Sequence, residues 1–218
     1  MYLRSNFSSS RLVRLLNAWS PLDTGASRQD FAERLGQWVG VSDAITLHAT
    51  HQSLMSRARV RPALARPAGT SALEEEFQRV RTALVQAISA NPVGGPVGEK
   101  FAPHRKRYVD LQRHMEMRIA ALRASARQAL STAAPELAPL AALDGVLDQM
   151  LVDREQRLMS AVPVLLERRF EHLRRSQPAT WPNQLHEEMQ QLLLAELDDR
   201  LQPVAGLVEA FSNMHKKQ

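Results

Sequence analysis

The residues able to do acid–base or metal chemistry are histidines, carboxylates and serines, since the 218-residue chain has no cysteine. None of the seven histidines stands in HExxH or Glu-x-x-His spacing, the patterns that place zinc or di-iron ligands on helix faces. No serine occupies a G-x-S-x-G turn. We therefore expect no enzyme activity, no cofactor, and no catalytic, metal-binding or cofactor-binding residues. The histidines are His48, His51, His104, His114, His172, His186 and His215.

Two local patterns resemble ligand sites but fit structural explanations better. His48 and His51 lie one helical turn apart and could share a ligand, although a lone pair of this kind is mostly structural. The glycine-rich run NPVGGPVGEK, residues 91–100, lacks the Gly-Lys-Ser/Thr ending of a phosphate-binding loop and follows a predicted helix. The sequence therefore predicts neither a metal site nor a nucleotide site there.

Clusters of basic side chains are a second binding signal. The chain has 28 Lys and Arg against 23 Asp and Glu, a formal net charge of +5, which favours a polyanionic partner such as duplex DNA. A solvated basic surface explains the same clusters, so both interpretations stay open. The candidate nucleic-acid-binding residues are Arg57, Arg59, Arg61, Arg105, Lys106, Arg107, Arg168, Arg169, Arg174 and Arg175.

A partial helix-turn-helix pattern lies in RLGQWVGVSDAIT, residues 34–46. It has a small residue at Gly36, a turn at Gly40 and a polar start to the next helix, as DNA-reading motifs require. However, Thr46 stands where an apolar residue usually packs, and Asp43 would face phosphates with the wrong charge. An ordinary helical hairpin is the better explanation. The outward-facing candidates would be Ser42, Asp43, Thr46, Thr50 and Gln52.

The element that must organise these side chains is the stretch from Ala141 to Ser176. Apolar residues recur there at steps of three and four, which predicts one long amphipathic helix with a charged outer face. Pro163 removes a backbone donor, so we expect the helix to bend at that residue. The predicted buried stripe comprises Leu143, Leu147, Met150, Leu151, Leu158, Val162, Leu165, Leu166, Phe170 and Leu173.

Similar periodicity over most of the chain, together with only 5% aromatic residues, predicts an all-α fold. We expect a helical bundle with short N-terminal helices and a long antiparallel helical hairpin, formed by a helix over 103–132 and the central stretch. Three parts follow: a short-helix region at 1–56, a basic linker at 57–70 and a long-helix bundle at 71–218. The other expected helices cover residues 8–19, 27–39, 42–55, 71–88 and 184–201.

The last apolar strip lies near the C-terminal end. Pro203 is expected to kink or end the helix over 184–201, and the strip continues beyond it. Such a strip either folds back onto the bundle or binds a partner helix, and both alternatives stay open. The partner-binding candidates are Val204, Leu207, Val208 and Phe211.

The expected compartment is the cytoplasm. No apolar run approaches the roughly 20 residues needed to cross a bilayer, so we expect no direct membrane insertion. Arg11 and Arg14 interrupt the apolar positions near the N-terminus, which does not resemble a signal peptide.

Several long strings resemble a proteobacterial family of unknown function. They are SSSRLVRLLNAW, SRQDFAERLGQWVGVSDAITL, EEEFQRVRTALVQAI, FAPHRKRYVDLQRHMEMRI, LAALDGVLDQML and VPVLLERRFEHLRR, spread over residues 8–176. Members of that family resemble ZorF, an accessory protein of type III Zorya anti-phage defence systems. The resemblance implies an accessory protein that works with a membrane proton-channel motor and with ZorG, a second accessory protein, against phage DNA.

Together these observations predict a non-enzymatic helical adaptor in anti-phage defence. It would pair with a ZorG-like accessory protein and meet the membrane motor complex only indirectly. The alternative is a double-stranded DNA-binding module that uses the clustered arginines, and an adaptor could also hold DNA. Self-association into a homo-oligomer is left open.

Overall fold

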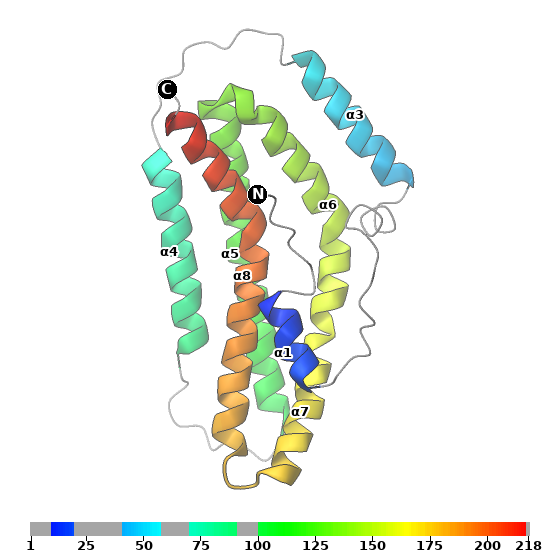
Figure 1. Ribbon diagram of the computed structural model, residues 1–218, viewed down its shortest axis with the longest axis vertical. Coiled ribbons are helices and arrows are strands. Elements are labelled where there is room, and N and C mark those ends of the chain that lie inside the picture. Colours follow the sequence, from blue (N-terminus) through cyan, green and yellow to red (C-terminus); the bar gives the residue numbers. More distant parts are fainter. Residues whose placement is uncertain (1–9, 20–40, 58–69, 91–99, 217–218) are drawn as a thin grey trace. The chain divides into compact units, whose positions relative to one another are not determined.

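The computed structural model describes residues 10–19, 41–57, 70–90 and 100–216, and every element within these ranges is a helix (Figure 1). The all-α prediction is therefore confirmed. The helix expected over 27–39 lies outside the described residues. The described elements are α1 (Arg11–Trp19), α3 (Val41–Arg57), α4 (Thr70–Ser89), α5 (Ala102–Ala133), the short 3-10 helix η2 (Pro135–Leu137), α6 (Ala138–Ser160), α7 (Val162–Ser176) and α8 (Trp181–Lys216).

The described residues divide into two compact units, and helices α4, α5, α6 and α8 each contribute to both. The predicted parts 1–56 and 57–70 fall in good part outside the described residues, so the three-part organisation stays a prediction. The first unit comprises residues 10–19, 80–90, 100–119 and 157–202, and the second comprises 41–57, 70–79, 120–156 and 203–216.

The core of the first unit follows the helical periodicity of the sequence. On α8, the apolar residues from Leu185 to Leu197 that the spacing selects are all buried. They meet buried side chains of α5, α7 and the second half of α4, and each such side chain contributes about 1.5–3 kcal/mol relative to an exposed one. The main buried residues of this unit are Leu84, Ile88, Tyr108, Met115, Leu166, Phe170, Leu173, Trp181, Leu185, Met189, Leu192, Leu193 and Leu197.

Polar contacts tie the shorter helices of the first unit to α8. The Ser10 hydroxyl, just before α1, donates to the Asp199 carboxylate at 2.6 Å. The Arg81 guanidinium on α4 lies 3.6 Å from the Asp198 carboxylate. Because these contacts are exposed or half-buried, they orient the outer helices while the apolar core supplies most of the stability.

In the second unit, the C-terminal apolar strip is part of the core. Val204, Leu207 and Phe211 are buried and Val208 is half-buried. Of the two alternatives for this strip, folding back onto the chain is the one observed. The proposal that these residues bind a partner helix is therefore corrected, because a partner could reach the three buried side chains only by displacing the core.

Helix α8 continues through Pro203 and ends at Lys216, so the expectation that Pro203 ends the helix is wrong. Pro203 is exposed, and water can there satisfy the carbonyl of the preceding turn that loses its N–H donor. The helix can therefore tolerate the proline, and its buried stripe stays in phase.

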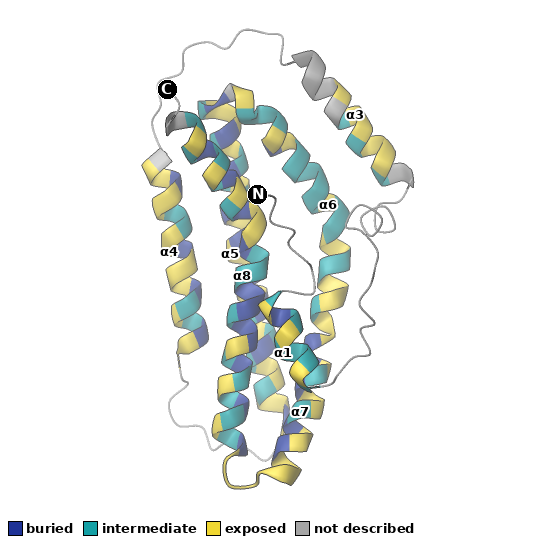
Figure 2. Ribbon diagram, viewed as in Figure 1, coloured by how far each residue is buried: buried dark blue, intermediate teal, exposed yellow. Residues whose placement is uncertain are grey.

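The predicted central helix is interrupted at Ala161, which separates α6 from α7. Pro163 lies in the first turn of α7, where a missing N–H costs little. The single long helix is therefore wrong, and the full-length hairpin stays a prediction. The predicted burial is also wrong for much of α6: Figure 2 shows it mostly half-buried or exposed, Ala141 is its buried residue, and Leu158 is 57% exposed.

Candidate functional site

A network of buried polar side chains lies between α5 and α8 of the first unit. The Glu196 carboxylate is fully buried and accepts a hydrogen bond from the Tyr108 hydroxyl at 3.1 Å. The Gln112 amide donates to the same carboxylate at 3.0 and 3.1 Å. The Arg200 guanidinium, one turn along α8, donates to it at 2.9 Å. Three donor groups from two helices therefore converge on one carboxylate.

Gln112 also links this network to the break between α6 and α7. Its amide nitrogen donates to the Met159 carbonyl at 3.3 Å. In an unbroken helix that carbonyl would accept from residue 163, but Pro163 has no N–H. Gln112 thus supplies the donor that the proline lacks, and it holds the break against α5.

The network gives each of its buried polar groups a hydrogen-bond partner. Burial, followed by the charge of Glu196, raises the pKa of the Tyr108 hydroxyl well above its usual value. Tyr108 therefore stays protonated and donates, and it is not available as a general base. We conclude that this cluster specifies how α5 and α8 pair.

Aromatic rings of α7 and α8 pack around the start of α5. The Phe170 ring lies with its centroid 5.5 Å from Phe101 and 5.2 Å from Trp181, the latter edge to face. The His104 imidazole joins them, 6.2 Å from Phe170 and 6.3 Å from Trp181. This aromatic cluster fixes the first turns of α5 and α8 against the middle of α7.

Burial lowers the pKa of His104, and the nearby His186 and Arg107 lower it further. Below about pH 6.5 the unfolded chain therefore binds a proton that folded His104 resists, so the free energy of unfolding should fall as the pH drops from 7.5 to 5.5. Urea unfolding followed by circular dichroism at both pH values measures this. His104→Phe, which keeps a ring, should show a weaker pH dependence; an unchanged dependence would contradict the assignment.

Arg169 is held on two sides within the first unit. Its guanidinium forms a bidentate pair with Glu188, at 2.7 and 2.8 Å, and lies 5.9 Å from the centroid of the Trp19 ring. The hydrogen bonds to Glu188 raise the pKa of Arg169. This side chain therefore joins α1, α7 and α8 and is committed to the fold.

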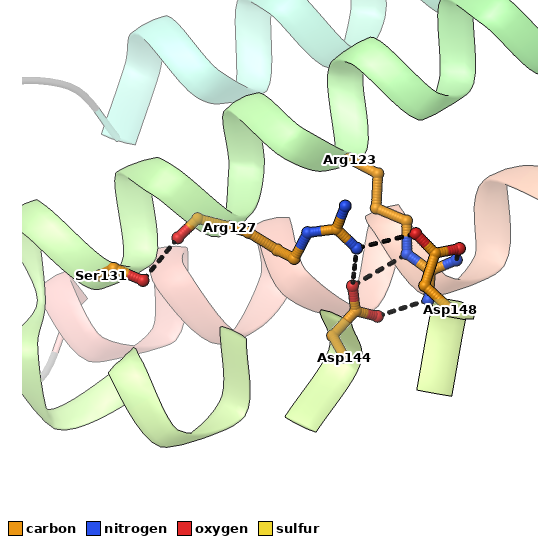
Figure 3. A network of polar contacts seen from close by, with 5 residues as sticks. All are labelled: Arg123, Arg127, Ser131, Asp144 and Asp148. Carbon is orange, nitrogen blue, oxygen red and sulfur yellow. Dashed lines mark hydrogen bonds and ion pairs between the residues drawn. The ribbon is translucent and has the colours of Figure 1, made fainter. Parts of the chain in front are cut away.

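In the second unit, two arginines of α5 face two aspartates of α6 (Figure 3). Arg123 forms a bidentate pair with Asp144 at 2.6 and 2.8 Å and also reaches Asp148 at 2.6 Å. Arg127 contacts the same carboxylates at 3.1 and 2.9 Å. Burial lowers the pKa of Arg123, but the hydrogen bonds to Asp144 and the charges of Asp144, Asp148 and Glu155 together outweigh it, and the pKa is raised. These residues pair across helices rather than on a solvated face.

Asp144→Asn should lower the free energy of unfolding by about 1.5–3 kcal/mol, because the Asp144 side chain is only 11% exposed and accepts charged hydrogen bonds. Asp148→Asn is the matched control. Its carboxylate is 35% exposed, so a loss of about 0.5–1 kcal/mol is expected. Urea unfolding measures both, and an equal loss in the two variants would contradict this ranking.

The first unit carries an excess of basic side chains. Over the full ranges that the two units span in the sequence, the first has sixteen Arg and Lys against eleven Asp and Glu, and the second has twelve against twelve. Of the exposed charged side chains described in the first unit, twelve are basic and four are acidic. The net charge of +5 on the whole chain therefore comes from the first unit.

The structure separates the nucleic-acid-binding candidates into three groups. Arg59, Arg61 and the side chain of Arg57 lie outside the described residues. Arg107 and Arg169 are half-buried, and Arg107 donates to the Ala90 carbonyl while Arg169 pairs as described above. The exposed candidates are Arg105, Lys106, Arg168, Arg174 and Arg175. Of these, Lys106 pairs with Asp110 at 3.0 Å and Arg175 donates to the Glu171 carbonyl at 3.2 Å.

The remaining sequence candidates lie on α3, and the structure describes the side chains of only some of them. His48 is exposed and its ring nitrogen lies 3.2 Å from the Gln52 amide nitrogen one turn away, while the side chain of His51 lies outside the described residues. The Thr50 hydroxyl donates to the Thr46 carbonyl within α3. Among described residues, no three His, Asp or Glu side chains are placed to hold a metal ion.

Exposed apolar side chains are a feature that the sequence did not reveal. In the first unit Met117 is 66% exposed, Leu158 57% and Val164 46%. Leu158 was expected in the buried stripe. That expectation is wrong because periodicity alone does not show where a helix breaks. None of the helices in the described ranges is both long and apolar enough to cross a bilayer.

Comparison with known families gives one match over nearly the whole chain. Residues 1–213 match the sequence model of a family described as "Protein of unknown function (DUF3348)". The chain belongs to this family. No curated protein and no solved structure matches it. For this DUF3348 member, function must therefore be argued from its own side chains.

The polar network shows which signal the sequence did contain. Gln112 follows Tyr108 by four residues and precedes Met115 by three, which places it on the buried stripe of α5. Glu196 occupies the equivalent position on α8, between Leu193 and Leu197. A polar residue at a stripe position predicts a buried partner, although the sequence does not say which one.

Proposed function

We propose that this chain is a non-enzymatic helical adaptor of an anti-phage defence system. It would pair with a ZorG-like accessory protein and act with a membrane proton-channel motor against phage DNA, meeting the motor only indirectly. The resemblance of residues 8–176 to the ZorF-like family supports the setting. The observation that carries the adaptor role is the surface of the first unit, with twelve exposed basic side chains against four acidic ones and with exposed apolar side chains, on an all-helical frame.

A surface with an excess of one charge attracts partners of the opposite charge and repels partners of the same charge. The exposed apolar residues of the first unit add surface that gains from being covered. The buried carboxylate of Glu196 is already occupied by three donors from its own unit. These features suit a protein that joins macromolecules.

The test is co-purification followed by a phage assay. The full chain, co-expressed with the ZorG-like protein, should elute with it from size-exclusion chromatography. Deleting the chain from the complete defence system should lower protection, measured as plaque-forming efficiency. A chain that elutes alone, and whose deletion leaves protection unchanged, would rule out this function.

The alternative function is binding of duplex DNA. It is favoured by exposed Arg105 on α5 and exposed Arg168 on α7, because the contacts of Phe170 with Phe101 and His104 bring those two helices together. Fluorescence anisotropy with a labelled duplex at 50 and 200 mM salt tests it. Arg105→Gln and Arg168→Gln should each reduce the log–log salt slope by about one. Absence of binding at low salt would dismiss it.

A further inference from the structure

Three apolar side chains form an exposed row across the break between α6 and α7. The Ala161 N–H donates to the Leu158 carbonyl at 3.2 Å, and the Ala161 carbonyl accepts from the Val164 N–H at 3.1 Å and from the Leu165 N–H at 3.3 Å. The hydrogen bonds between residues i and i+3, which characterise the 3-10 helix, bring side chains three apart toward one side of the segment. Ala161 keeps helical dihedrals, φ −77° and ψ −23°, so Leu158, Ala161 and Val164 lie on successive turns.

The opposite side of this segment is anchored within the first unit. Val162, Pro163 and Leu166 are buried, and the Met159 carbonyl accepts from Gln112 at 3.3 Å. The row is therefore presented by a fixed backbone, which lowers the entropic cost of binding. Exposed, aligned apolar side chains on a fixed helix are the usual receptor for the apolar face of another helix.

The charges around this row indicate which kind of partner helix would bind to it. Exposed Arg157 directly precedes Leu158 in the sequence, and exposed Arg168 lies one helical turn after Val164. Glu167 and Glu171 are also exposed on α7, so the attraction for an acidic partner comes from the excess of twelve basic over four acidic side chains on the unit as a whole. Phosphates of DNA would gain nothing from the three apolar side chains, whereas an amphipathic helix uses both features.

We propose that Leu158, Ala161 and Val164, in their basic surroundings, dock an acidic amphipathic helix of a partner protein. This inference rests on the proposed adaptor function and identifies one of its binding faces. The partner helix lays apolar residues spaced three and four apart onto the row, and its Asp and Glu residues face the arginines of the first unit.

The experiment uses the full chain and two synthetic helical peptides of about 18 residues, long enough for five turns. Both carry Leu at the same positions, and the remaining positions are Glu in one peptide and Lys in the other. Fluorescence anisotropy at 100 mM salt should show the acidic peptide binding at least tenfold more tightly. The double variant Leu158→Ser/Val164→Ser should weaken that binding at least tenfold, and Arg168→Glu should weaken it severalfold.

The matched control is Ile45→Ser/Val152→Ser, which removes two exposed apolar side chains from the second unit and should bind as wild type. Circular dichroism confirms that each variant is folded. Equal affinity for both peptides, no binding of the acidic peptide, or equal weakening by the control would overturn the proposal. So would a wild-type dimer in sedimentation that Leu158→Ser/Val164→Ser converts to monomer, since the occupant would then be a second copy.

The two proposals fail separately. If the chain binds the acidic peptide but never co-purifies with the ZorG-like protein, the docking face stands and the assigned partner is wrong. If it co-purifies and Leu158→Ser/Val164→Ser has no effect on either measurement, the adaptor role stands and this face is not its docking site.

Discussion

Replacing Glu196 with alanine should destabilise the protein by about 3–5 kcal/mol. The substitution leaves the Arg200 guanidinium, the Gln112 amide and the Tyr108 hydroxyl without their shared acceptor. Donors that are buried and unpaired lose hydration without recovering a hydrogen bond, and the guanidinium contributes most because it is charged. A loss of this size is a large share of the 5–15 kcal/mol typical of a folded protein. Urea unfolding followed by circular dichroism measures it.

Two controls separate the charge from the hydrogen bonds. Glu196→Gln keeps an acceptor oxygen and the shape of the side chain, so it should cost less than Glu196→Ala. Tyr108→Phe removes one donor of the network and should cost about 0.5–1.5 kcal/mol. If Glu196→Ala proves no more destabilising than Tyr108→Phe, the carboxylate is not the centre of this network.

The sequence predicted the helices whose apolar residues repeat without interruption. On α8, the positions Leu185, Met189 and Leu192 recur at steps of four and three, and all are buried. The stripe also stays in phase beyond Pro203, although the proline argued for an end to the helix. Periodicity is informative here because one face of the helix is covered along much of its length.

Periodicity did not predict burial correctly where the helix is broken or where two of its faces are partly covered. The apolar spacing from Leu143 to Leu173 reads as one helix, but the break at Ala161 shifts the facing side chains, and Leu158 is exposed. Pro163 indicated that the helix is distorted nearby. It could not show that the helix would restart one residue earlier, with the proline in its first turn.

The basic excess of the first unit was not visible in the sequence for a different reason. Each unit is assembled from separated segments, so the basic residues near Arg105 and Arg168 join one unit only when the chain is folded. Along the chain, those segments alternate with acidic ones such as Glu74–Glu76 and the Asp144–Asp148 turn. Only the fold therefore shows that the basic side chains outnumber the acidic ones on a single unit.

The clustered basic residues also differ in whether they contact groups of their own unit. Arg107 and Arg169 looked equivalent to their neighbours in the sequence, yet both are half-buried and contact a group of their own unit. Exposed Arg105 and Arg168 differ from these two residues in their position on the helix, because they lie outside the face that packs against other helices. A cluster of basic residues on a helix is thus divided by the helical period between structural and binding roles.

Phe170→Ala should lower the free energy of unfolding by about 3–5 kcal/mol, because Phe170 is buried among aromatic rings and its loss leaves a cavity. The rings of Phe101 and Trp181 lose their partner, and edge-to-face contact adds about 0.5–1.5 kcal/mol beyond burial. Phe170→Leu, which keeps much of the volume, should cost less. Val164→Ala, on the exposed face of the same helix, should change stability by less than about 0.5 kcal/mol. Urea unfolding of the three variants settles the order, and a Val164→Ala loss as large as that of Phe170→Ala would mean that α7 packs through the face assigned here to a partner.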